Sequence, residues 1–528
     1  MALAVLPSLV AALAALTMEW VPASDHALEV LRISEVGTRY TPLVGAYSRM
    51  GWHHPGPLLF WASAPLYRLA GPEGVLASVG LLTAASAGLA VVAARRIGGH
   101  SLMWLAAVAA VVLQLSLGDH VVDPWNPYVP IVALLAYLLC TWRAAEGDGW
   151  LLLAAVATGS YCVQAHVGYA PVVLAGAGFA LARAGARRRS GTPVPSYRWV
   201  AAAGLVGLAL WSGPLLQSWG DNGGNLLHIW EERRSPDEPA VGWEEGLRLA
   251  GRQFGVPAPW MGAREMDPNG LARRGSPLAV AAILLAGIVL AAVLRRRGDA
   301  QRAWFIAYAL ALTGVAVWGL TRISGLPAPY LTRPCWSVAA LLYVSVAWGV
   351  VGLVGSAAGA RRAARAAAVA VTAASLAAAG IAASLEVPNT QHAVAVAALS
   401  EQIRDELDPS VEHSVTLLDQ RDLGSVGTGV VVDLQRRGWK LYVAPAYAHP
   451  FRPWRTHPPD PLPRLVIISD PEAREWTPPP DGRRVAAVNG QLPQEPGNDY
   501  EAWLAPCRQR CRSGPGGSDV SYERHQTG

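Results

Sequence analysis

The chain has 528 residues, of which 52% are hydrophobic and 15% are charged. Its apolar residues come in blocks of about 18 to 22, the length that crosses a hydrocarbon core of about 30 Å, which excludes a string of ordinary soluble domains. The formal net charge of +5 does not indicate nucleic-acid binding, because the arginines gather where membrane topology needs them. The composition therefore predicts an α-helical polytopic membrane protein.

Eleven transmembrane helices are expected along the chain. They cover residues 2–18, 74–94, 101–117, 128–142, 150–165, 169–183, 199–216, 277–294, 302–320, 334–354 and 366–385. The first is expected to be an uncleaved span, because no basic segment precedes its apolar run. Together they define a predicted transmembrane domain over residues 1–385.

Clusters of arginine fall in alternate loops between these spans, and the positive-inside rule places those loops in the cytoplasm. The clusters are Arg95–Arg96, Arg143, Arg187–Arg189, Arg295–Arg297 and Arg361–Arg365. The protein is therefore expected in the cytoplasmic (plasma) membrane, with its N-terminus on the cytoplasmic side. The first loop (19–73), the long loop (217–276) and everything after about residue 386 are expected outside. The long loop could be a mobile lid over a site or simply a solvated loop.

The external C-terminal part alternates between strand-like and helix-like segments. Helices are expected at 392–407 and 423–438, and strands at 414–419, 440–444 and 464–469. This order predicts a small extracytoplasmic α/β domain over 386–470, followed by a Pro/Gly-rich, partly disordered tail over 471–528. Cys507 and Cys511 in that tail could form a disulfide or remain free.

Polar side chains collect in the predicted outer loops. The segment DPWNPY contributes Asp123, Trp125 and Asn126; other candidates are Gln164 and His166 at a span end, and Tyr330 and Arg333 in YLTRPCW. Carboxylates, imidazoles, amides and aromatic rings on one face suit a site for a polar substrate. Each of them could equally be a loop, turn or interface residue, with the aromatic rings forming the usual membrane-interface belt and Arg333 an interfacial anchor.

The first outer loop carries the most specific pattern. Asp25 follows the first span, a helical segment with mixed charges comes next, and His54-Pro55-Gly56-Pro57-Leu58 precedes Phe60-Trp61. This order resembles the first external loop of the GT-C superfamily of membrane glycosyltransferases, which includes protein O-mannosyltransferases, aminoarabinose transferases and arabinofuranosyltransferases. The resemblance covers roughly residues 19–80. The chain departs from the pattern at His26, where a second acid is expected, and at His54, where the family has a lysine.

The resemblance implies a GT-C-like catalytic domain that transfers a sugar, with inversion, from a polyprenyl-phosphate-linked donor on the outer face of the membrane. The acceptor would be a glycan, a lipid or a protein, and membrane lipids would be the other partners. Asp25 would be the catalytic base. Its alternative role is to cap the helix that begins beside it, since Asp is a favoured N-cap residue.

The remaining candidates divide by the chemistry of the substrate. Cationic side chains that could hold the donor phosphate are Arg32, Arg49, His53, His54 and Arg333; those that could hold the sugar or the acceptor are Asp123, Trp125, Asn126, Gln164, His166 and Tyr330. No cofactor is predicted with certainty. A divalent metal could be bound by His53 and His54 with Asp25 or Asp123, but no typical metal-ligand spacing occurs in the sequence.

Two other functions stay open. A transporter or flippase of lipid-linked saccharides would carry ionisable residues near the middle of its spans and often shows repeats, and the sequence has few such charges and no repeats. A non-catalytic membrane scaffold would bind cell-envelope partners through its external module, and it would tolerate the loss of Asp25.

Overall fold

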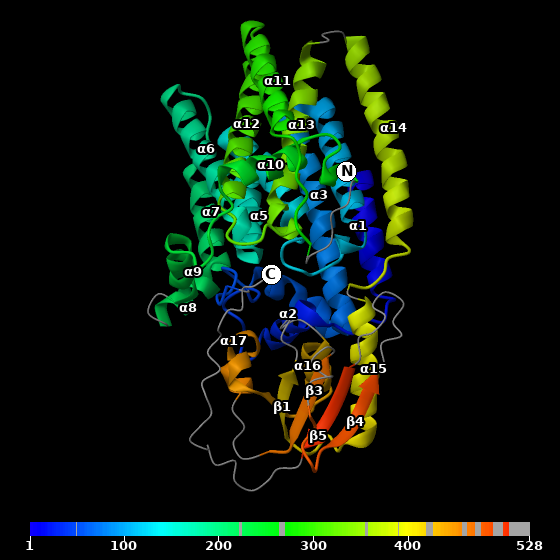
Figure 1. Cartoon of the computed structure of the whole chain (residues 1–528). Coiled ribbons are helices and arrows are strands. Elements are labelled where there is room, and N and C mark those ends of the chain that lie inside the picture. The colour runs from blue at the N-terminus through cyan, green and yellow to red at the C-terminus, as the bar shows by residue number, and fades with distance from the viewer. Residues whose placement is uncertain are drawn as a thin grey trace. The chain divides into compact units, whose positions relative to one another are not determined.

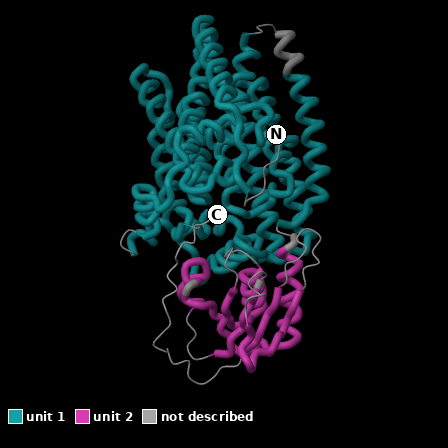
Figure 2. Tube along the Cα trace, viewed as in Figure 1, with its two compact units in different colours: residues 1–390 teal, residues 391–528 magenta. Residues whose placement is uncertain are grey.

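The computed structural model describes residues 1–48, 50–220, 224–262, 270–353, 357–388, 390–418, 426–456, 462–469, 477–488 and 500–505. The chain forms two compact units, Met1–Thr390 and Gln391–Gly528 (Figure 2). The predicted boundary near residue 386 therefore lies within a few residues of the observed one.

The first unit is a bundle of helices. The apolar helices are α1 (Ala2–Ala15), α3 (Leu58–Leu117), α4 (Pro130–Ala145), α5 (Gly149–Ala165), α6 (Ala170–Arg189), α7 (Tyr197–Leu210), α8 (Ser212–Gly220), α11 (Pro277–Arg296), α12 (Ala300–Thr321), α13 (Pro334–Leu353) and α14 (Ala357–Ala382). Along one edge of the bundle, α1, α3 and α14 lie side by side (Figure 1). In α4 every residue except Arg143 is buried, as expected for a helix that is apolar on all sides and lies at the centre of the bundle.

Helix α3 runs for 60 residues but is broken twice, at Ala70–Gly71 and at Gly98–Gly99. Gly71 and Gly99 have φ values of +64° and +63°, a left-handed conformation that glycine adopts without steric cost. The two breaks separate the predicted spans 74–94 and 101–117 from each other and from the helical segment before them.

A multi-pass helical fold is confirmed, whereas the number of spans stays a prediction. Among the described residues, six helices are long and apolar enough to cross a membrane, or seven if α7 and α8, bent by 54°, form one span. Helices α1, α4 and α5 are apolar but shorter, and they coincide with three further predicted spans.

The two predicted outer loops also contain helices. The first loop contains α2 (Ser24–Glu35), which ends just before Gly37 with its φ of +80°, a common C-terminal stop. The long loop contains α9 (Gly224–Arg234) and α10 (Gly242–Phe254). Because α10 packs against α11 and α12, this part of the predicted lid belongs to the bundle.

The second unit contains a five-stranded sheet with the order β2-β1-β3-β5-β4. Its elements are α15 (Thr390–Glu406), β1 (His413–Leu418), α16 (Val426–Arg436), β2 (Leu441–Val443), the short α17 (Ala448–Phe451), β3 (Arg464–Ser469), β4 (Arg483–Val488) and β5 (Tyr500–Ala505). Strand β1 pairs in parallel with β2 and β3, while β5 is antiparallel to both β3 and β4.

The predicted helices and the first three strands are confirmed, but the predicted tail is wrong in part. Residues 483–488 and 500–505 are strands of the same sheet, so the α/β domain extends past residue 470. Cys507 and Cys511 lie outside the described residues.

Candidate functional site

Asp25 lies in the first turn of α2, and its carboxylate points to the turn that links α3 to α4. Its Oδ2 accepts a hydrogen bond of 3.0 Å from the indole nitrogen of Trp125. The N-cap residue of α2 is Ala23, and no side chain caps the helix. The alternative role of Asp25 as a helix cap is therefore wrong.

The residue before Asp25 has a strained backbone. Ser24 has a φ of +58°, a conformation that costs a residue other than glycine about 1–3 kcal/mol. Such strain persists only where the surrounding structure enforces it, and it is common at functional sites. It places Asp25 at the very start of the helix, beside the α3–α4 turn.

Asp123 is the hydrogen-bonding centre of that turn. Its Oδ1 accepts from His26 Nε2 at 2.6 Å and from the backbone nitrogen of Trp125 at 2.8 Å. Its Oδ2 accepts from His120 Nδ1 at 2.7 Å. Burial alone would raise the pKa of Asp123, but the charge of His26 and these hydrogen bonds hold that pKa well below its usual range. Asp123 is thus an ionised, fully engaged carboxylate.

Glu29 is a third carboxyl group in this region. It lies one helical turn after Asp25 on the same face of α2 and is buried. Burial and the negative charges of Asp25 and Asp123 raise the pKa of Glu29 well above its usual value, although the backbone N–H of Asn126 is close enough to oppose this. Within the described residues its oxygens make no hydrogen bond of good geometry, so the environment of Glu29 favours its neutral form.

Asp25 itself is only partly buried. Burial raises the pKa of Asp25, while the hydrogen bond from Trp125 and the charge of His26 lower it. A carboxylate with a raised pKa is a better proton acceptor than an ordinary aspartate.

Trp125, which donates to Asp25, is part of a cluster of aromatic rings. The indole ring contacts the rings of Tyr128 and Tyr330, with centroid distances of 4.9 Å and 5.2 Å in edge-to-face geometry. Tyr330, in the 3₁₀ turn Pro329–Thr332, also contacts His166 at 6.4 Å. The structure thus brings together Trp125, His166 and Tyr330, three of the predicted sugar-binding residues.

His54 and His166 form a buried pair of imidazoles, with ring centroids 4.5 Å apart. Burial and the neighbouring His166 hold the pKa of His54 well below its usual range, and burial lowers the pKa of His166 to about 4. The Nδ1 of His54 accepts from the backbone of Val167, and the Nδ1 of His166 accepts from Gly168. Both rings are therefore neutral with the proton on Nε2, and neither is the cation that the sequence suggested at His54.

The two candidate arginines lie in different environments. Arg333 is fully buried, and its guanidinium lies over the rings of Tyr128 and Trp336 at 5.4 Å and 4.6 Å. Through Tyr128 it belongs to the same cluster as Asp25. Arg32 is buried on α2 and forms an ion pair of 2.8 Å with Glu35, three residues later.

Three other candidates take part in hydrogen bonds between a side chain and the backbone. Gln164 donates to the carbonyl of Leu210 at 2.9 Å, and Asn126 donates to that of Ala165, also at 2.9 Å. The backbone N–H and carbonyl of His53 both bond to the side chain of Asn225, on α9. These contacts join α5 to α7 and to the turn between α3 and α4, and they join the first loop to α9. Arg49 lies outside the described residues.

The residues that the metal alternative requires are not assembled. Among the described residues, no group of three or more His, Cys, Asp or Glu side chains is arranged to hold a metal ion.

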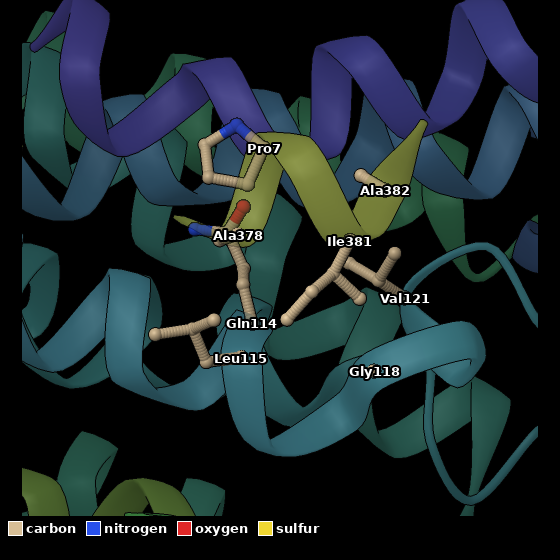
Figure 3. A pocket seen from close by; sticks show the side chains of 8 residues that line it. All are labelled: Pro7, Gln114, Leu115, Gly118, Val121, Ala378, Ile381 and Ala382. Atoms are coloured by element: carbon tan, nitrogen blue, oxygen red, sulfur yellow. The ribbon is translucent and has the colours of Figure 1, made fainter. Parts of the chain in front are cut away.

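A small pocket, whose lining includes none of the predicted site residues, lies between α1, α3 and α14 (Figure 3). It is lined mainly by apolar side chains, and its polar member, Gln114, already bonds to the backbone of Ala4 and Ala110. The pocket therefore offers little to a polar substrate.

Sequence reasoning missed Glu29 and His26 as members of the site. Glu29 sits four residues after Asp25, a spacing that places both carboxyl groups on one helical face. That spacing was a usable signal. The pairing of His26 with Asp123 joins residues 97 positions apart, and no local pattern indicates it.

Comparison with known proteins shows a likeness to solved structures. No protein-family model and no curated protein sequence matches the chain. The crystal structure of ArnT from Cupriavidus metallidurans in the apo state aligns over 94% of this chain and 96% of its own, with 14% sequence identity and a TM-score of 0.51. The structure of the same protein bound to undecaprenyl phosphate aligns over the same shares, with 15% identity and a TM-score of 0.47. The fold of this chain is therefore similar to that of ArnT.

Proposed function

We propose that the chain is a glycosyltransferase that uses a sugar linked to a polyprenyl phosphate, on the outer face of the cytoplasmic membrane. The observation that carries the proposal is the Asp25 carboxylate, which Trp125 holds at the edge of an aromatic cluster that also contains the buried Arg333. The fold supports it, because ArnT is an aminoarabinose transferase of the GT-C type and has been crystallised with undecaprenyl phosphate.

The reaction is a single displacement at the anomeric carbon of the donor. A hydroxyl oxygen of the acceptor forms the new bond to that carbon while Asp25 takes the hydroxyl proton. The bond from the anomeric carbon to the phosphate oxygen breaks, and the polyprenyl phosphate leaves with the electron pair. Because one displacement occurs, the anomeric configuration is inverted. The acceptor hydroxyl belongs to a glycan, a lipid or a protein.

The leaving phosphate requires positive charge and hydrogen-bond donors. Arg333 is the proposed cation, because its fork of N–H donors matches phosphate geometry. Neutral His54 and His166 each present an Nε2–H donor from the same cluster. Arg32 is a weaker candidate, since its guanidinium is already paired with Glu35.

The sugar is proposed to lie against the aromatic rings. Trp125 and Tyr330 are both partly exposed, their rings are in edge-to-face contact, and Trp125 bonds to Asp25. Such rings offer an apolar face to the C–H groups of a sugar, while Asp25 can reach a hydroxyl at their edge.

The test is transfer of radiolabelled sugar from a mixed pool of polyprenyl-phosphate sugars, by purified wild-type protein and Asp25→Asn in nanodiscs. We expect transfer by the wild type and a loss of several orders of magnitude in the variant. Exposed Asp237→Asn, on the long loop, is the matched control and should behave as the wild type. Equal transfer by Asp25→Asn would remove Asp25 as the base. No transfer by folded wild-type protein that still binds the lipid would favour a transporter or a scaffold.

A further inference from the structure

The Asp123 carboxylate has no part in the proposed displacement, yet it is 2% exposed and accepts three hydrogen bonds. Burying an ionised carboxylate is costly unless donors and positive charge compensate it. A buried, ionised carboxylate next to a proposed base is expected to have a function. The hydrogen-bond donors of Asp123 indicate which function this is.

His26 is one of these partners and is positively charged. Its Nε2 donates to Asp123 at 2.6 Å, and its ring also bonds to the backbone carbonyl of Ala23. An imidazole that donates from both nitrogens is an imidazolium. Burial would lower the pKa of His26, but the charges of Asp123 and Asp25 and these hydrogen bonds raise it.

Two routes connect Asp123 to Asp25. Through its side chain, Asp123 fixes the His26 imidazolium, which is the immediate neighbour of Asp25 on α2. Through the backbone of Trp125, it fixes the residue whose indole donates to Asp25 Oδ2. Removal of Asp123 would loosen both contacts at once.

We propose that Asp123 and His26 are positioning residues for Asp25: Asp123 orients the His26 imidazolium and the Trp125 indole, and these two groups favour the ionised form of the Asp25 carboxylate and aim it at the acceptor. This inference rests on the proposed function. His26 here stands where the resembling family carries a second acid, so the chain supplies positive charge at that position.

Other titratable groups face this centre and enter its pH dependence. Glu29 lies on the same face of α2 as Asp25, His120 bonds to Asp123 from the turn, and Tyr161 of α5 interacts with Glu29. Among the groups of this cluster, His26 is the one whose charge lowers the pKa of Asp25.

The experiment is the pH dependence of kcat and kcat/KM for sugar transfer by His26→Asn, His26→Lys and Asp123→Asn. In His26→Asn the acidic limb of kcat/KM should move to higher pH by about one unit or more, because the carboxylate loses an adjacent positive charge. The KM for the donor should change less than kcat. His26→Lys retains the charge and should keep the limb near its wild-type position.

Asp123→Asn should move the limb in the same direction, because an unpaired, buried His26 loses its proton. It should also lower the plateau of kcat by tenfold or more, since Trp125 loses its anchor. Exposed His100→Asn, at the second break of α3, is the control and should leave the profile unchanged.

An unchanged acidic limb in folded, active His26→Asn would overturn the proposal, and so would an equal shift in His26→Lys. Inactivity of the wild type would instead refute the proposed function. In that case the inference is tested by titrating the infrared band of the protonated Asp25 carboxyl. This band is assigned by its loss in Asp25→Asn. Its titration should move to higher pH in His26→Asn, and an unmoved titration would overturn the inference.

Discussion

Close packing against Gly56 joins the first loop to α5 at the scale of single residues. A Cβ atom at Gly56 would lie 2.1 Å from Gln164 Oε1 and 2.4 Å from its Cδ. Gln164 is fully buried and bonded to Leu210, so it has no free space in which to move aside. The motif His-Pro-Gly-Pro thus needs its glycine for packing.

Gly56→Ala should therefore destabilise the protein by about 1–3 kcal/mol, the usual cost of overpacking a buried site. The measurement is the thermal unfolding midpoint in detergent. Gly178→Ala is the control, because a Cβ there meets nothing within 4 Å. Adding Gln164→Ala to Gly56→Ala should recover part of the loss. Simple additivity of the two changes would contradict the overlap.

The His166 imidazole makes stability depend on pH. Its pKa is about 4 in the folded protein, below its ordinary value of 6.5, so the unfolded chain binds a proton more readily. Stability should therefore rise as the pH increases from about 4 to about 6.5, by at most about 3 kcal/mol from this group. The neutral His54 contributes in the same direction.

Thermal unfolding midpoints measured across this pH range should show a smaller slope in His166→Gln than in the wild type. The raised pKa of His26 works in the opposite direction, because its stabilisation is lost as the pH rises past that pKa. The test therefore compares the slope of the unfolding midpoint against pH in the wild type with the slope in His166→Gln. An identical slope in His166→Gln would show that His166 is not held neutral.

The sequence indicated the members of the site better than their roles. Asp25, Trp125 and Arg333 were predicted, and the structure brings them into one cluster. Asp123 and Asn126 were predicted to hold the sugar or the acceptor, yet their polar groups are engaged within the protein. Side-chain roles depend on contacts between distant segments, which residue type and local spacing do not encode.

At the scale of elements, α2 departs most from a simple pattern. It has charged residues on several sides, and a solvated helix is the ordinary expectation for such a sequence. Nevertheless Glu29, Arg32 and Glu35 are buried. The surroundings of Glu29 favour its neutral form, and Arg32 and Glu35 form an ion pair with each other. A charged helix that is buried beside the proposed base suits the floor of a site more than a linker.

The second unit shows where composition misled the prediction. The segment after residue 470 is rich in proline and glycine, which favours disorder. Its two strands are only six residues long each, and their pairing is entirely with each other and with β3. Short segments of this kind have no strong periodicity of their own. The longer helices and β1, with its alternating burial, were predictable.

Ala502→Pro should disrupt this sheet. Ala502 is fully buried in β5 and lies opposite Ile467 of β3 and Ala486 of β4. Proline removes one backbone donor in the middle of the sheet and leaves its acceptor unpaired, at a cost of about 1–3 kcal/mol. Limited proteolysis of membranes should cut the variant within residues 391–528 faster than the wild type. Glu501→Gln, on the same strand, should match the wild type, and equal cleavage of Ala502→Pro would refute the strand.

At the scale of the whole molecule, the distribution of arginine predicts the sidedness of the chain. Ser410 and Arg188 are both exposed and belong to segments predicted on opposite sides of the membrane. In a background of Cys507→Ser and Cys511→Ser, a membrane-impermeant maleimide should label Ser410→Cys in intact cells. It should label Arg188→Cys only after permeabilisation. The described native cysteines are buried and should stay unlabelled.

Labelling of Arg188→Cys in intact cells would reverse the predicted orientation and place the Asp25 cluster on the cytoplasmic side. The fold alone carries no such information, because a bundle of apolar helices packs equally well in either orientation. Sidedness was therefore predicted from the loops, and the structure adds the positions of the helices.

The position of β5 has a consequence for how the protein is made. A chain is synthesised from its N-terminus, so β1, β2 and β3 exist well before residues 500–505 emerge. Until β5 arrives, β3 keeps one edge open and β4 has no neighbour among the described strands. An open strand edge readily pairs with another chain. Nascent or prematurely terminated chains that end before residue 500 should therefore be the aggregation-prone and chaperone-dependent forms of this protein.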